Sequence, residues 1–138
     1  MPTPGMPTPS RPLAIQEKQE LGTGGRIYEG GQLLSEVLLS EYRQRLPSMR
    51  VLELGSGTGI GGLTAAAAGA RVLLTDGAPE LLPLLEANVR RNAEAGSLRG
   101  SAEVRLLRWG DERDTEACLL YTSPSPRDAT LSRMPSSA

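Results

Sequence analysis

The residues of this sequence best suited to surround a ligand are three alternating glycines, Gly55, Gly57 and Gly59. They follow a short, mostly apolar run at 50–54 and precede an alanine-rich stretch, so they lie between a predicted strand and a predicted helix. Glycines at such a junction let the backbone turn sharply and let a ligand approach amide protons at the start of the helix. The alternative is a turn without a ligand, but a turn needs fewer glycines.

Two acidic residues accompany this loop. Asp76 ends the next predicted strand, where an acidic residue can accept hydrogen bonds from both ribose hydroxyls of an adenosine cofactor; a simple Asx turn is the alternative. Glu53 precedes the first glycine by two residues. Its carboxylate would repel a pyrophosphate and attract a cofactor that carries an ammonium and a sulfonium group. The simpler interpretation of Glu53 is a solvated or helix-capping charge.

A nicotinamide dinucleotide site is the main rival interpretation. Gly57, Gly59 and Gly62 satisfy the dinucleotide pattern G-x-G-x-x-G, although a single match is a weak signal. The run of glycines also begins two residues before this pattern. Asp76 is compatible with both cofactors, whereas Glu53 favours S-adenosylmethionine.

The only tryptophan, Trp109, follows a third predicted strand. Its ring could cover an adenine by stacking, or it could be a packing residue at the surface of the domain. The sequence leaves both roles open.

These residues need a scaffold, and periodicity predicts one of alternating strands and helices. Predicted helices cover residues 32–42, 58–68 and 79–95, and predicted strands cover 50–54, 71–75 and 103–108. Strands that alternate with helices of about 10–15 residues indicate a parallel sheet with right-handed crossovers. The fold class is therefore α/β. Because such sheets bind ligands beyond the carboxyl ends of their strands, we expect the glycine loop and Asp76 to lie in one site.

The composition argues against several classes of function. The chain has 138 residues, a net charge of −1, no histidine and one cysteine. A near-neutral chain offers nucleic acid no electrostatic attraction, and without histidine or paired cysteines a metal site is not expected. No apolar run approaches the roughly 20 residues of a membrane-spanning helix. We expect a monomer in the cytoplasm, with the nucleus as a second location, and no nucleic-acid or membrane partner.

Three regions of the chain differ in composition. Residues 1–25 are rich in proline and threonine and then charged, and we interpret them as a disordered leader. Residues 26–117 carry the pattern of a folded domain. Residues 118–138 are what results when the two ends of a common sequencing adapter are translated in one frame around a sample index. We therefore interpret 118–138 as a non-native, adapter-derived tail and expect no catalytic role for Cys118; an ordinary disordered Ser/Pro-rich tail is the alternative.

The motifs resemble those of the seven-strand class I methyltransferases, in particular the protein-lysine methyltransferase group that includes calmodulin-lysine and elongation-factor methyltransferases. The resemblance covers about residues 26–112. It is carried by VLELGSGTG at 51–59, LLTD at 73–76, LEANVRRN at 85–92 and LRWG at 107–110. It implies a Rossmann-like parallel sheet and S-adenosyl-L-methionine as the cofactor.

This resemblance, with the motifs above, assigns cofactor binding to Glu53, Gly55, Ser56, Gly57, Gly59, Asp76, Trp109 and Tyr28. It assigns no catalytic and no metal-binding residue. Tyr28 stands where the group usually carries a tryptophan. The acidic and aromatic motif that lines the acceptor pocket after a fourth strand has no counterpart here. We therefore predict a sheet truncated after its third strand, with the central strand as an open edge, and a chain that is inactive alone.

The predicted function is the transfer of a methyl group to a lysine of a protein substrate. A small-molecule methyltransferase on the same fold shares every motif, and only the acceptor pocket separates the two. A non-catalytic module that binds an adenosine cofactor or a dinucleotide is the third alternative.

Overall fold

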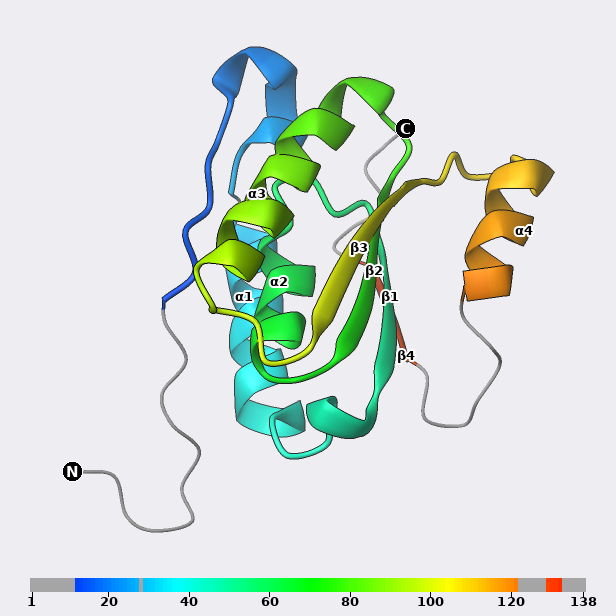
Figure 1. The fold of residues 1–138 in the computed structure, drawn as a ribbon. Helices are drawn as coiled ribbons and strands as arrows, with labels where there is room; N and C mark the ends of the chain where they lie inside the picture. Colours follow the sequence, from blue (N-terminus) through cyan, green and yellow to red (C-terminus); the bar gives the residue numbers. More distant parts are fainter. Residues whose placement is uncertain (1–11, 28, 122–128, 133–138) are drawn as a thin grey trace, which may run out of the picture.

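The sheet is built from short apolar runs that pair in parallel. The computed structural model describes residues 12–27, 29–121 and 129–132. Within these ranges the sheet has four strands, in the order β3-β2-β1-β4 (Figure 1). They are β1 (Arg50–Leu54), β2 (Arg71–Asp76), β3 (Ser101–Leu106) and β4 (Ala129–Ser132). The predicted α/β class and the parallel sheet are confirmed.

Helices pack on both faces of this sheet. One face carries α1, α2 and α3, and the other carries α4 (Figure 1). These helices are α1 (Glu29–Val37), α2 (Ile60–Ala67), α3 (Leu82–Glu94) and α4 (Glu112–Tyr121). Shorter turns of helix are η1 (Gln19–Gly25), η2 (Leu38–Tyr42), η3 (Leu46–Ser48) and η4 (Pro79–Leu81). None of the helices that the structure describes combines the length and the apolar character needed to cross a bilayer.

The alternation of side chains along the strands divides the core into two layers. Toward α1, α2 and α3, the strand residues Val51, Val72 and Leu74 pack with the helix residues Leu63 and Leu85. All five side chains are at most 1% exposed.

The second layer, toward α4, is smaller. Leu73 and Leu107 are buried there with Cys118 of α4, and Leu52 and Leu54 are half-buried beside them. The sheet therefore has one well-covered face and one face that α4 covers in part.

Residues 12–25, which the composition assigned to a disordered leader, have a defined structure instead. Residues 12–18 run beside α3, and η1 follows them (Figure 1). Their main chain forms hydrogen bonds with two asparagine side chains of α3, Asn88 and Asn92, and two apolar side chains of the segment pack against the core. Composition missed this because the partners lie more than 70 residues away in the sequence.

The three strands predicted from the sequence are all present, and β4 adds a fourth. It pairs in parallel with β1, so Val51, Leu52 and Glu53 have strand partners on both sides. This corrects the expectation that the central strand is an open edge. Parallel pairing uses main-chain groups, so a short segment can pair with such an edge even if its sequence is not native to the protein. The adapter origin of 118–138 stays a prediction.

Some boundaries differ from those predicted. The strand predicted at 103–108 lies two residues earlier, and the helix predicted at 32–42 is an α-helix that continues as the π-helical η2. Leu33, an apolar residue of this helix, is 61% exposed. The core-facing positions are taken by Leu34 and Leu38, which lie one turn apart.

Cys118 reports on the packing of α4 against the sheet. Its side chain is 3% exposed, and burial raises the pKa of its thiol, so the reactive thiolate is scarce. We expect an aromatic disulfide reagent to label the native chain at least about tenfold more slowly than the chain in concentrated guanidinium chloride. Because the chain has one cysteine, the signal has a single source. Equal labelling rates would contradict the packing of α4.

Candidate functional site

The loop between β1 and α2 follows a path that glycine adopts most easily. Gly55, Gly57 and Gly59 have φ angles of 67°, 57° and 92°, all in the left-handed region. The Ser56 amide donates a hydrogen bond to the Thr75 carbonyl of β2, and the Gly59 amide donates one to the Ser56 carbonyl, both at 2.8 Å. The glycines that the sequence singled out are therefore the residues at which the chain turns.

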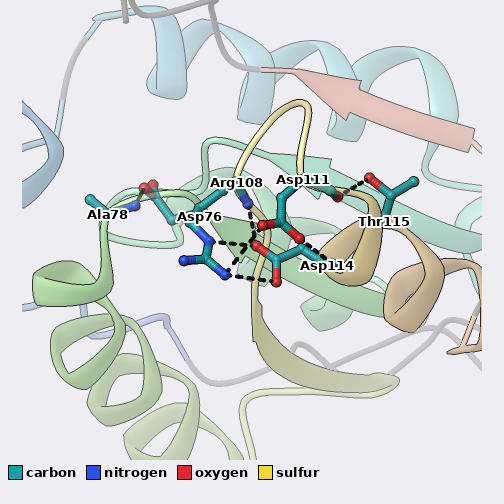
Figure 2. Close-up of polar contacts among 6 residues, drawn as sticks. All are labelled: Asp76, Ala78, Arg108, Asp111, Asp114 and Thr115. Carbon is teal, nitrogen blue, oxygen red and sulfur yellow. Dashed lines mark hydrogen bonds and ion pairs between the residues drawn. The ribbon is translucent and has the colours of Figure 1, made fainter.

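The carboxylate of Asp76 joins this loop to the loop after β2. Its Oδ2 accepts a hydrogen bond from the Gly57 amide and its Oδ1 accepts one from the Ala78 amide, both at 3.0 Å. Figure 2 shows Asp76 beside Ala78, a contact that forms an Asx turn. A carboxylate has about four acceptor positions, so about two remain for other donors. The two interpretations of Asp76, turn and ligand, are therefore compatible.

Two hydroxyl groups in the loop are further candidates to contact a ligand. The side chains of Ser56 and Thr58 are fully buried, and neither oxygen has a hydrogen-bond partner among the described residues. A buried polar group without a partner costs about 1–3 kcal/mol, which a bound polar group would offset. Ser56 is among the predicted site residues. Thr58 is not, although its place between two of the glycines was a signal that could have found it.

Glu53 does not stand at the open end of the site, as the sequence argument assumed. Its side chain is fully buried, on the same face of β1 as Val51. A Cβ added to Gly61 would lie 2.5 Å from its Oε2, and one added to Gly62 would lie 2.8 Å from its Oε1. The carboxylate therefore lies against the first turn of α2, whose partial positive charge stabilises an anion. These two glycines make room for it, a role that sequence reasoning missed.

The turn after β3 carries Trp109, which is 49% exposed. The preceding residue, Arg108, pairs with Asp114 at 2.8 Å and with Asp111 at 3.5 Å (Figure 2). The hydrogen bond between Arg108 and Asp114 raises the pKa of the guanidinium and lowers the pKa of the carboxyl. These pairs tie the turn to the start of α4. Trp109 is thus a surface residue whose ring is partly open to solvent.

Most of the predicted site residues lie at one edge of the sheet. Hydrogen bonds join the glycine loop to Asp76, and the Leu107 amide donates to the Asp76 carbonyl at 3.0 Å, which brings the turn of Trp109 to the same edge. Tyr28 lies outside the described residues. Within the described part of the chain, no cluster of three or more Cys, Asp or Glu side chains could hold a metal ion.

Residues 7–121, well over half of the chain, match the family described as lysine methyltransferase. The chain belongs to this family. In this member of the family the motif at 51–59 forms β1 and the glycine loop, and the motif at 73–76 ends β2 at Asp76.

Curated relatives agree with this assignment. Protein N-lysine methyltransferase METTL21A of Danio rerio is 35% identical over 99 residues, which are 72% of this chain and 44% of the relative. EEF1A lysine methyltransferase 3 of Mus musculus is 36% identical over 90 residues, or 65% of this chain and 37% of the relative. Histone-arginine methyltransferase METTL23 of Xenopus laevis is 38% identical over 79 residues, or 54% of this chain and 32% of the relative. The chain spans less than half the length of each.

The third motif, at 85–92, lies in α3 and supplies two buried asparagines, Asn88 and Asn92. Sequence reasoning gave them no role. The signal available in the sequence was a pair of asparagines four residues apart, which places both amide side chains on one face of the predicted helix. The structure buries both side chains, and asparagine is seldom fully buried without hydrogen-bond partners.

Replacement of Gly59 by alanine tests how closely the loop is packed. At Gly59 an alanine would meet a φ of 92° and a Cβ contact of 2.8 Å with Leu85 Cδ1, whereas at Gly96 it would meet a φ of 74° and no atom within 4 Å. We expect Gly96→Ala to lower the free energy of unfolding by about 1 kcal/mol and Gly59→Ala by about 2–4 kcal/mol. Urea denaturation measures both. Equal losses would contradict the close packing of the loop.

Proposed function

We propose that this chain belongs to the cofactor-binding part of an S-adenosylmethionine-dependent methyltransferase that acts on a lysine of a protein substrate. The observation that carries the proposal is the glycine loop with its tether. Left-handed glycines follow β1 and are tied to an acidic residue at the end of β2, in a member of the lysine methyltransferase family.

Several groups of the chain fit the cofactor. The free acceptor positions of Asp76 suit the two ribose hydroxyls, and the buried hydroxyls of Ser56 and Thr58 would gain partners from its polar groups. The ring of Trp109 is exposed enough to stack on an adenine. Glu53 adds a negative charge beneath the first turn of α2, which favours a cationic ligand over a pyrophosphate.

The chemistry divides between the cofactor and the protein. When bound, the cofactor supplies a methyl group on a sulfonium, which is reactive toward an amine. The protein aligns the acceptor nitrogen with this methyl group and excludes water. A lysine with an ordinary pKa near about 10.4 must lose its proton, at a cost of about 4–5 kcal/mol at pH 7. The acceptor site therefore has to favour the neutral amine.

An arginine acceptor is the second candidate. One relative is named a histone-arginine methyltransferase and is 38% identical over 79 residues, so a cofactor half of this kind is compatible with either acceptor. A small-molecule acceptor, the monomeric state and the cytoplasmic location stay predictions. This chain is predicted to be inactive alone, so an assay with labelled cofactor and lysine-containing or arginine-containing peptides separates the protein acceptors only in a protein that also carries the acceptor site.

Calorimetry of the full chain tests the cofactor. We expect S-adenosylhomocysteine to bind with a Kd in the micromolar range, a free energy of about −8 kcal/mol. We expect NAD to bind at least about 100-fold more weakly, because a pyrophosphate at the glycine loop would lie close to the negative charge of the buried Glu53 carboxylate. Preferential binding of NAD would contradict the proposal.

Removal of the Asp76 carboxylate tests the ribose contact. We expect Asp76→Ala to raise the Kd of S-adenosylhomocysteine by about 10–100-fold, because hydrogen bonds to a charged acceptor contribute about 1.5–3 kcal/mol. Asp76→Asn keeps one acceptor oxygen, so its Kd should lie between that of the unmodified chain and that of Asp76→Ala. Glu80→Ala removes an equal charge from an exposed position nearby and should leave the Kd unchanged. Equal affinity of Asp76→Ala and the unmodified chain, with circular dichroism showing both folded, would contradict the ribose role.

A further inference from the structure

The side chain of Asn88 contacts two segments that are distant in the sequence. It is fully buried on α3. Its Nδ2 donates to the carbonyl of Thr58 in the glycine loop at 2.9 Å and to the carbonyl of Gln16 at 3.0 Å. Its Oδ1 accepts a hydrogen bond from the Gln16 amide at 2.8 Å. Both N–H groups of the side-chain amide are therefore used.

The contact with Thr58 fixes one peptide plane of the loop. The carbonyl of that plane accepts from Asn88, and its amide, which belongs to Gly59, donates to the Ser56 carbonyl at 2.8 Å. A plane held at both ends cannot rotate, although the glycine at its amide end, Gly59, would allow rotation. Asp76 holds the amide of Gly57, two residues earlier in the loop. Two side chains from different elements thus set the direction of the loop amides.

Asn92 makes the same pair of contacts one helical turn further along. Its Oδ1 accepts from the Ala14 amide at 2.7 Å, and its Nδ2 donates to the Ala14 carbonyl at 2.9 Å. Four residues of helix rise about 6.0 Å, and two residues of extended chain span about 6.6 Å. Because these two lengths are similar, two residues of the segment that are two positions apart can each form hydrogen bonds with one of two asparagines that are four positions apart on α3. The Nδ2 of Asn92 also donates to the Asn88 carbonyl at 2.7 Å. Among the described residues its side chain makes no hydrogen bond with the glycine loop, so Asn92 serves as a matched control.

We propose that Asn88 is a positioning residue for the cofactor. Residues 12–18 set cofactor affinity, because they hold the side-chain amide of Asn88 in the orientation that binds the Thr58 carbonyl. The inference rests on the proposed function, because it takes the glycine loop as the cofactor site. When Gln16 occupies one N–H and the oxygen of this amide, the second N–H points to the loop. Loss of that contact lets the peptide plane between Thr58 and Gly59 rotate. The loop conformation that binds the cofactor is then only one of several, and the affinity falls.

Paired alanine variants of the full chain test the role of Asn88. Asn88→Ala and Asn92→Ala remove the same group from the same helix, and both lower the stability measured by urea denaturation. We expect Asn88→Ala to raise the Kd of S-adenosylhomocysteine about tenfold or more, and Asn92→Ala to change it less than about threefold, under conditions where both chains are folded. Equal changes in Kd would overturn the proposal.

A second pair acts on the segment and leaves α3 intact. Gln16→Pro removes the amide that donates to Asn88, and Ala14→Pro removes the one that donates to Asn92. Of these two variants, we expect only Gln16→Pro to weaken the binding of S-adenosylhomocysteine. If Ala14→Pro weakens binding as much, the segment acts through its docking as a whole, and the specific role of Gln16 is wrong.

Hydrogen exchange separates this inference from the proposed function. We expect Asn88→Ala to speed exchange of the Gly59 amide in the absence of ligand, and Asn92→Ala to leave it near the rate of the unmodified chain. An unmodified chain that does not bind S-adenosylhomocysteine would contradict the proposed function. An unchanged Gly59 rate in Asn88→Ala would contradict the positioning role by itself.

Discussion

Two main-chain amides at the carboxyl end of the sheet share one carboxylate, that of Asp76. Because β1 and β2 run parallel and in register, they end side by side, and each leaves amides beyond its last strand partner. Asp76 accepts from one amide of each following loop, Gly57 and Ala78. On the other side of the glycine loop, Asn88 holds the Thr58 carbonyl. A loop fixed in this way loses little conformational freedom when a ligand binds.

The parts of this arrangement that sequence could predict are local ones. β1 was predicted at its observed bounds, and the predicted 71–75 strand continues one residue to Asp76, because a short buried run closed by glycines has few other interpretations. The turn at Gly55, Gly57 and Gly59 follows from the same pattern, since left-handed backbone angles favour glycine. Asp76 could be placed in the site because parallel strands bring their carboxyl ends to one edge.

The parts that sequence could not predict depend on contacts between distant segments. Glu53 lies in an apolar strand, and its burial follows from where α2 packs and from the space left at Gly61 and Gly62. The docking of residues 12–18 depends on Asn88 and Asn92, whose spacing on α3 has meaning only once the extended segment lies beside them. Composition described that segment as disordered because proline-rich and charged residues seldom form a core. Packing against α3 outweighs that tendency over the described residues.

The most direct test of the cofactor site is an NMR titration of the full, isotope-labelled chain with S-adenosylhomocysteine. The site proposed here consists of the glycine loop and the Asp76 tether. It predicts the largest changes in chemical shift at the amides of Gly57, Gly59 and Ala78, and no change at Gly96, whose left-handed turn follows α3. Saturable changes elsewhere with an unperturbed glycine loop would contradict this account.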